Sequence, residues 1–179
     1  MLVAENNTGI SVGRGNGEVH VHVAGRGTFQ NGQPLRRYAV EMIGQGARQF
    51  VVDLGQCEGM DSTFLGVLAG IGLQLREPPT RGRLCLANVS SRNLELLQTL
   101  GLDRLFEIAP AAPAGIPLQQ LADRAVPAST PTAKSEVANL MLEAHDNLIR
   151  ADGRNQAKFK DVTAVLRARA DQCAAEKPS

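Results

Sequence analysis

The sequence predicts an α/β fold: a largely parallel sheet of four to five strands flanked by helices, followed by a separate helical segment. Three observations lead to this prediction. Strand-like and helix-like patterns alternate through short connections over roughly residues 8–109. A proline-rich stretch then interrupts the pattern, and a helical period returns from residue 134. The length of 179 residues suits one ordinary domain with an appendage, or two small domains.

The first expected element is a hairpin. Residues 18–23 alternate polar and apolar side chains strictly, which is typical of a half-buried strand. Residues 9–12 can form its partner, because residues 14–17 read Arg-Gly-Asn-Gly, a good hairpin turn. The valines face the core, so His20 and His22 are expected to point to solvent. An H-x-H pair can also chelate a metal ion, but the solvated face is the favoured interpretation.

The elements after the hairpin alternate between helix and strand. Residues 35–43 carry apolar side chains at helical spacing and end at Gly44. Residues 50–54 form a short apolar run, typical of a strand that is buried on both faces. The remaining elements follow in order: a helix at 63–75, a strand at 83–87, a helix at 93–100 and a strand at 105–108.

The chain divides into three parts on these patterns. Residues 1–109 form the α/β domain, residues 110–132 a proline-rich linker, and residues 133–179 a helical hairpin or one long helix. Asp152 and Gly153 form a turn signal, which favours the hairpin. Each helix has one apolar stripe, and an isolated pair cannot bury both. We therefore expect the hairpin to pack on the first domain, on a second copy of the chain in a homo-oligomer, or on a partner.

Composition narrows the function classes. Lys and Arg number 19 against 18 Asp and Glu, a formal charge of +1, and 3% of residues are aromatic, which argues against nucleic-acid binding. We expect no membrane span, no secretory signal and a cytoplasmic location. Three scattered cysteines predict neither a disulfide frame nor a zinc site. The glycines at 13, 15 and 17 lie between two strands, not before the helix that a dinucleotide-binding loop needs. No cofactor is expected.

The strongest local signal is the run Asp61, Ser62 and Thr63, where a buried strand is followed by a helix. Asp61 or Ser62 is placed to cap that helix, and spacing alone favours simple capping. The corner lies at the carboxyl edge of the sheet, where α/β sites tend to lie, and a phosphate there would meet the positive end of the helix dipole. The sequence argues against a serine nucleophile, because it lacks G-x-S-x-G and His145 lies beyond the linker.

The residues around this corner resemble the STAS domains of the anti-sigma-factor antagonist family. The resemblance covers residues 8–109, and the segments that carry it are Gly25 and residues 50–54, 60–68, 82–89 and 96–106. It implies a sheet flanked by helices and a phosphorylatable serine directly after the aspartate, here Ser62, with Thr63 as the fallback acceptor. In such systems an anti-sigma factor that is a serine kinase phosphorylates the antagonist, and a PP2C-type phosphatase removes the phosphate.

Two features depart from that family pattern. Phe64 stands where many antagonists have glycine, and its ring is expected to change the docking surface. The C-terminal helical segment lies outside the usual short form. From these two departures we expect this protein to have a partner network of its own, distinct from that of the short antagonists.

We therefore predict a non-enzymatic, phosphorylation-controlled switch, with Ser62 as phosphoacceptor and a partner-binding surface at Asp61, Ser62, Thr63 and Phe64. The first alternative is an unphosphorylated scaffold in a signalling complex. The second is an enzyme with Ser62 as nucleophile. We expect neither a metal ion nor a cofactor.

Overall fold

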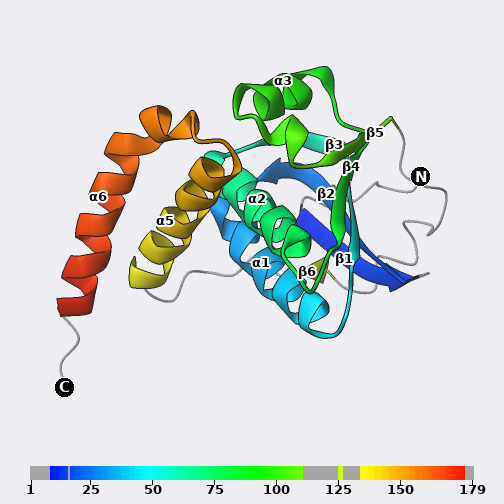
Figure 1. Ribbon diagram of the computed structural model, residues 1–179, viewed down its shortest axis with the longest axis horizontal. Helices are drawn as coiled ribbons and strands as arrows, with labels where there is room; N and C mark the ends of the chain where they lie inside the picture. Colours follow the sequence, from blue (N-terminus) through cyan, green and yellow to red (C-terminus); the bar gives the residue numbers. More distant parts are fainter. Residues whose placement is uncertain (1–8, 16, 111–124, 127–133, 176–179) are drawn as a thin grey trace, which may run out of the picture.

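The computed structural model describes residues 9–15, 17–110, 125–126 and 134–175. The strands are β1 (Gly9–Gly15), β2 (Glu18–Gly27), β3 (Gln49–Met60), β4 (Arg83–Ala87), β5 (Glu107–Ala109) and β6 (Ala125–Val126). The helices are α1 (Phe29–Gly44), α2 (Ser62–Arg76), α3 (Ser91–Thr99), α5 (Lys134–Ala151) and α6 (Asn155–Ala175), with a 3-10 turn, η1 (Leu102–Arg104). Figure 1 shows the sheet on one side of the molecule, with α1 and α2 packed against it and α6 outermost.

The sheet has the order β5-β4-β3-β2-β1-β6. The predicted hairpin is confirmed, since β1 and β2 pair antiparallel with Ile10 opposite Val23. The pairs from β2 to β5 are all parallel, because a helix or a longer connection separates each strand from the next. Over the described residues the sheet has six strands, where the sequence predicts four to five. The short β6, which comes from the predicted linker, pairs with β1 through Ile10 and Val126.

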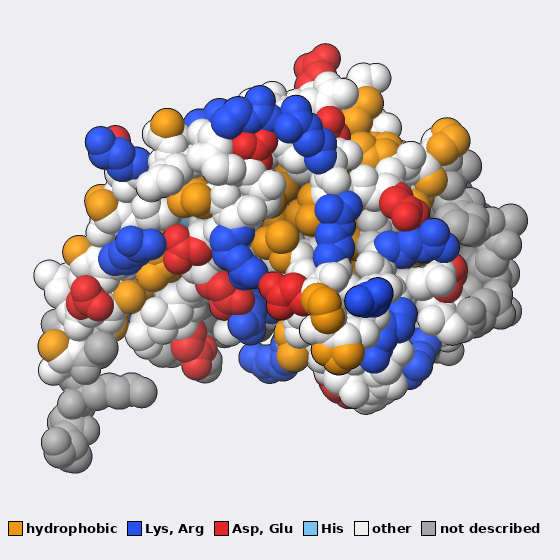
Figure 2. Space-filling view, in the orientation of Figure 1, with side chains coloured by type: hydrophobic (Ala, Val, Ile, Leu, Met, Phe, Trp, Pro, Cys, Tyr) orange, Lys and Arg blue, Asp and Glu red, His pale blue; other side chains and the backbone are white. Residues whose placement is uncertain are grey.

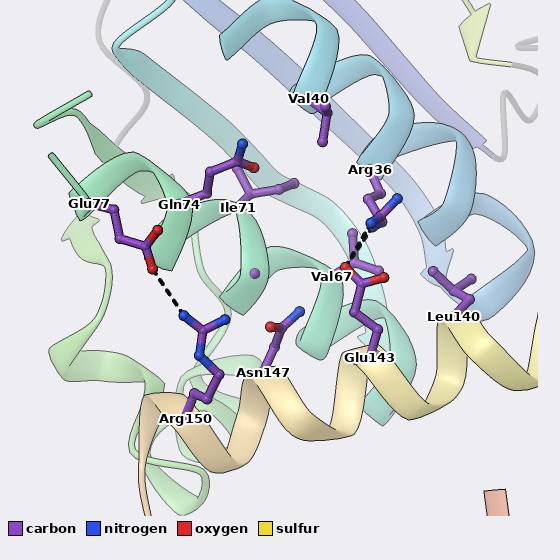
Figure 3. Close-up of a pocket in the computed structure, with 12 residues that line it drawn as sticks. Arg36, Val40, Val67, Ile71, Gln74, Glu77, Leu140, Glu143, Asn147 and Arg150 are labelled. Carbon is purple, nitrogen blue, oxygen red and sulfur yellow. Dashed lines mark hydrogen bonds and ion pairs between the residues drawn. The ribbon is translucent and has the colours of Figure 1, made fainter. Parts of the chain in front are cut away.

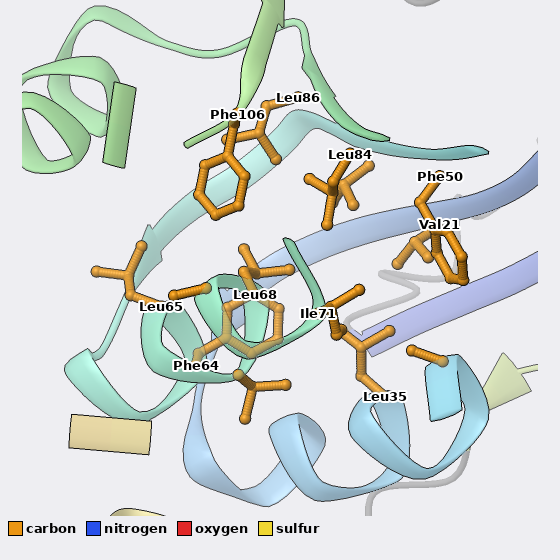
Figure 4. Close-up of a cluster of buried hydrophobic side chains, with 14 of the residues drawn as sticks. Val21, Leu35, Phe50, Phe64, Leu65, Leu68, Ile71, Leu84, Leu86 and Phe106 are labelled. Carbon is orange, nitrogen blue, oxygen red and sulfur yellow. The ribbon is translucent and has the colours of Figure 1, made fainter. Parts of the chain in front are cut away.

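The hydrophobic core lies between the sheet and the helices (Figure 4). The valines of β2 alternate into it, as the period-2 pattern predicts, and each is at most 1% exposed. α2 is buried on nearly all sides, and Leu65, Leu68 and Ala69 are each at most 1% exposed. A helix that is apolar on every side needs neighbours on every side. The sheet and α1 supply part of that cover, and α5 supplies the rest.

Two boundaries differ from the sequence prediction. β3 continues to Met60, well past the apolar run 50–54, because it stays paired with β2 through two register shifts. The last predicted strand starts later, at Glu107. Leu105 and Phe106 instead lie before it, 7% and 4% exposed, and pack into the core.

The C-terminal segment is two helices, joined at Asp152–Arg154 as the turn signal indicates. Of the three coverings expected for its apolar stripes, the structure shows the first: α5 packs on α2 (Figure 1). Leu140 and Leu148 of α5 are members of the same core cluster as the sheet residues. The apolar stripe of α5 is therefore buried within the chain itself.

Candidate functional site

Asp61 ties together the starts of two helices. One carboxylate oxygen, Oδ1, accepts the N–H of Phe64 at 2.8 Å and so caps α2, as predicted. The other, Oδ2, accepts the N–H of Phe29 at the start of α1, at 3.0 Å. The backbone N–H of Asp61 in turn donates to the Gly27 carbonyl at 2.9 Å. Both carboxylate oxygens thus hold the corner that carries the predicted site.

Ser62 is the first residue of α2, half-buried, and it contacts a histidine from the far end of the chain. Its Oγ lies 3.1 Å from Nε2 of His145 on α5. The other ring nitrogen, Nδ1, lies 2.6 Å from the Met141 carbonyl oxygen, which can only accept, so Nδ1 carries a proton. In the neutral ring, Nε2 is therefore unprotonated and accepts a hydrogen bond from the Ser62 hydroxyl. The sequence argument that the linker keeps His145 away from Ser62 is wrong.

His145 itself is fixed in place. Its residue is 5% exposed, and its ring meets Phe159 of α6 edge to face, with centroids 4.9 Å apart. The C-terminal hairpin thus presents one oriented imidazole to the serine.

Thr63 and Phe64 lie beneath the surface, 4% and 0% exposed. The Phe64 ring points into the core (Figure 4), where a Cβ on Gly27 would stand 2.5 Å from it. The expectation that this ring changes the docking surface is therefore wrong. Of the four predicted partner-binding residues, Asp61 and Ser62 are the two with partly exposed side chains in this structure.

The contact between α2 and α5 was not part of the predicted site. A Cβ on Gly66 would collide with the Ala144 carbonyl oxygen, and one on Gly70 would collide with the Asn147 amide. Asn147 Nδ2 also donates to the Gly66 carbonyl at 3.3 Å. The signal in the sequence is the pair of glycines four residues apart on an apolar helix, a spacing that lets another helix approach closely.

A cavity of about 300 Å³ lies beside this contact, between α1, α2 and α5 (Figure 3). Val67 and Ile71 form part of its wall. Two ion pairs border it: Arg36 Nη2 lies 2.8 Å from Glu143 Oε1, and Arg150 Nη2 lies 3.0 Å from Glu77 Oε1. Its lining residues are Arg36, Val40, Val67, Gly70, Ile71, Gln74, Glu77, Leu140, Glu143, Ala144, Asn147 and Arg150.

The histidines of β2 form a separate polar cluster. The prediction that they point to solvent is wrong, since His20 and His22 are 8% and 9% exposed. His20 Nε2 lies 3.4 Å from Glu18 Oε2, and His22 Nδ1 lies 3.5 Å from Asp53 Oδ2. Within the part of the chain that the structure describes, no group of three or more His, Cys, Asp or Glu could hold a metal ion.

On the face that Figure 2 shows, basic and acidic side chains are interspersed, and neither sign of charge dominates. Among the described residues, no helix combines the length and the hydropathy that crossing a bilayer requires.

Comparison with solved structures identifies the fold. The anti-sigma factor antagonist SpoIIAA in its unphosphorylated form superposes with a TM-score of 0.50 at 19% identity, over 57% of this chain and 89% of that one. A putative anti-sigma factor antagonist from Thermotoga maritima gives a TM-score of 0.51 at 18% identity, over 55% and 84%. At these identities the likeness concerns the fold. No curated protein matches the sequence significantly.

The sequence also matches a family model described as "Mlab, STAS domain" over residues 10–108. That span runs from β1 to β5 and includes the Asp61–Ser62 corner, which is the part of the chain that carries the predicted resemblance. Since the match extends over more than half of the chain, this protein belongs to the STAS domain family.

Proposed function

We propose that this protein is a phosphorylation-controlled partner-binding switch, in which Ser62 is the phosphoacceptor. The observation that carries the proposal is the position of Ser62. It is the first residue of α2, two residues after the carboxyl end of the central strand β3, and it is half-buried at a corner where Asp61 accepts one N–H from the start of each of two helices. The fold is that of proteins named anti-sigma factor antagonists, one of which has been described in an unphosphorylated form.

The chemistry of the modification fits this corner. Ser62 Oγ would attack the γ-phosphorus of a nucleoside triphosphate; the new O–P bond replaces the bond to the diphosphate, and the kinase's base takes the hydroxyl proton. The product carries about −1.5 to −2 charges at neutral pH. Asp61 opposes this charge, but both its oxygens already accept N–H bonds, and the positive end of the α2 dipole favours an anion.

The proposed partners are a serine kinase that acts as the anti-sigma factor and a PP2C-type phosphatase. A partner docked over Ser62 would have to desolvate or repel a phosphate where it otherwise meets a hydroxyl, which costs roughly several kcal/mol and lowers affinity by about a hundredfold or more. Thr63 remains the fallback acceptor, and its 4% exposure makes Ser62 the better one.

Intact-mass measurement and site mapping on the protein purified from its own cells test the proposal. One phosphate on Ser62, absent from Ser62→Ala and retained in Ser90→Ala, is the expected result. Ser90 is a suitable control because it too stands at the start of a helix, as the cap of α3. Titration of the identified partner then compares the unmodified and phosphorylated chains. Equal affinities would end the switch and leave the second candidate, a STAS scaffold that binds its partner without phosphorylation.

One contact favours a third candidate, a serine-nucleophile enzyme. Ser62 Oγ and His145 Nε2 have the separation of a nucleophile and its base, and the Met141 carbonyl fixes the tautomer. A fluorophosphonate probe discriminates: an adduct on Ser62 that disappears in His145→Ala supports the enzyme, and no adduct supports a binding protein.

A further inference from the structure

We propose that α5 is a tethered competitor for the surface around Ser62, so that a kinase or a partner reaches the serine only when α5 leaves α2. This inference rests on the proposed function, because it concerns access to the same serine. Its first basis is that the site is occupied in this structure: His145 of α5 holds the Ser62 hydroxyl at 3.1 Å. A transferred phosphoryl group must approach that same oxygen.

The second basis is the closeness of the two helices. One turn along α2 from Ser62, the backbone of α5 packs directly on Gly66, where even a methyl group would collide with the Ala144 carbonyl. Ala144 is the neighbour of His145, so the two contacts form one continuous strip. A phosphoryl group on Ser62 would compete with the His145 ring for the space at Oγ, where Nε2 already lies 3.1 Å away. The docked form therefore corresponds to the unphosphorylated protein.

The third basis is the kind of contact that holds α5. Both ion pairs at its edge are open to water: the side chains of Arg36 and Glu143 are 43% and 46% exposed, and those of Arg150 and Glu77 are 59% and 61% exposed. Such pairs contribute little to stability. Beneath them lies the cavity of about 300 Å³. Leu140 and Leu148 of α5 are buried in the core cluster, so release of α5 exposes them to water, and we expect opening to begin at this solvent-accessible edge.

Because α5 belongs to the same chain as the surface around Ser62, it lowers the apparent affinity of a separate partner for that surface. A segment joined to its own site competes at an effective concentration on the order of millimolar. The apparent dissociation constant of the partner rises by the inverse of the fraction of molecules in which α5 is released. Weakening the α5 contact without touching Ser62 should therefore raise both phosphorylation and partner affinity.

The experiment measures the access of a reagent to position 62 in the full chain. Ser62→Cys is made together with Cys85→Ser and Cys173→Ser. Cys57 stays, because it is buried and burial raises the pKa of its thiol, so it reacts slowly. N-ethylmaleimide then labels the thiolate introduced at position 62: the sulfur bonds to one carbon of the maleimide double bond, the other carbon takes a proton from water, and a thioether results. The observed rate is the intrinsic rate multiplied by the open fraction.

Gly66→Ala is the test variant, since the three atoms nearest to its methyl group are all backbone atoms of Ala144 on α5. We expect it to speed labelling at least about tenfold. Gly44→Ala is the matched control at the end of α1, where a Cβ meets nothing within 4 Å, and it should leave the rate unchanged. Hydrogen exchange on the same variants should show α5 losing protection while β2 and β3 keep theirs.

Three results would overturn the proposal. The first is labelling of the parent as fast as that of the urea-unfolded chain, which means that α5 does not cover the site. The second is a labelling rate that stays slow in two variants, Gly66→Ala on α2 and Ala144→Glu on α5. The third is loss of protection in the sheet together with α5, which makes the helix an inseparable part of the core.

The outcome is distinguishable from that of the proposed function. The labelling experiment does not depend on phosphorylation. If α5 is released in that experiment but Ser62 carries no phosphate in cells, then α5 controls access to the binding surface of an unphosphorylated scaffold. Conversely, phosphate on Ser62 with α5 immovable means that the kinase acts with α5 in place. In cells, the Gly66→Ala chain should carry more phosphate on Ser62 than the Gly44→Ala chain.

Discussion

The Oγ of Ser62 and Nε2 of His145 lie 3.1 Å apart, although the two residues are 83 positions apart in the chain. One residue starts the central helix of the STAS domain, and the other lies in a helix beyond the residues that the family model matches. The appended helices are therefore part of the environment of the serine on which the proposed function depends.

This hydrogen bond should be measurable as a coupling. His145→Ala removes a buried ring and should lower the free energy of unfolding by about 2–3 kcal/mol, while Ser62→Ala should cost about 1 kcal/mol. Because each change removes the same bond, the double variant should be less destabilised than the sum by about 1 kcal/mol. Urea unfolding of the four chains gives the cycle. Strict additivity would show that the two side chains do not interact in solution.

Asp61 should matter more than an ordinary helix cap. Asp61→Ala removes the acceptor of two N–H groups at once, those of Phe64 and Phe29, and should lower the free energy of unfolding by about 2–4 kcal/mol. Ser90→Ala is the comparison, because that hydroxyl accepts one N–H at 3.3 Å and its loss should cost about 1 kcal/mol. Equal losses in urea unfolding would mean that the second bond contributes nothing.

Gly27 should be intolerant of even one methyl group. The added Cβ would lie 2.5 Å from the Phe64 ring, which has no space to retreat because it is fully buried, so Gly27→Ala should destabilise the fold by about 1–3 kcal/mol. Gly59→Ala, on β3, adds a Cβ with nothing within 4 Å and should change stability by less than about 0.5 kcal/mol. Thermal unfolding compares them. A neutral Gly27→Ala would place the ring elsewhere.

A chain that ends at Ala109 should still fold cooperatively, but with a lower midpoint and lower solubility than the full chain. It keeps the sheet from β1 to β5 with α1 to α3, and it loses Leu140 and Leu148 from the core cluster. The surface of α2 around Val67 then faces water, which favours association. Circular dichroism during heating measures the transition. An unfolded spectrum at low temperature would mean that the division at residue 109 is wrong.

The turn between α5 and α6 should lose an interaction in acid. The Arg154 guanidinium and backbone N–H bind the Asp152 carboxylate and lower its pKa from an ordinary 3.8 to about 2. Because the folded pKa lies below the unfolded one, the stabilisation is complete above the unfolded pKa and disappears as the pH falls through about 2. An NMR titration of the carboxyl group measures the pKa, and Arg154→Gln should move it back towards 3.8. The same value in both chains would rule out the pair.

Local patterns alone specified much of the fold. The alternation along residues 18–23 fixed which side of β2 faces the core, because a strand has a period of two and valine belongs inside. Asp61 before an apolar helix specified the cap of α2 and the place of the corner, because free N–H groups at a helix start need an acceptor. The turn at Asp152 and Gly153 specified two helices in place of one. Each of these depends on neighbours within a few residues.

Tertiary packing decided what surrounds the corner. His145 could not be assigned to Ser62 from the sequence, because the apolar stripe of α5 fits equally well on its own domain, on a second copy or on a partner, and periodicity does not distinguish them. Gly66 and Gly70 settle the choice only once α5 is seen to pack on them. The burial of His20 and of Phe64 likewise depends on elements distant in sequence. Which faces meet is a property of the whole folded chain, and so the sequence specified the serine, while the fold specified its cover.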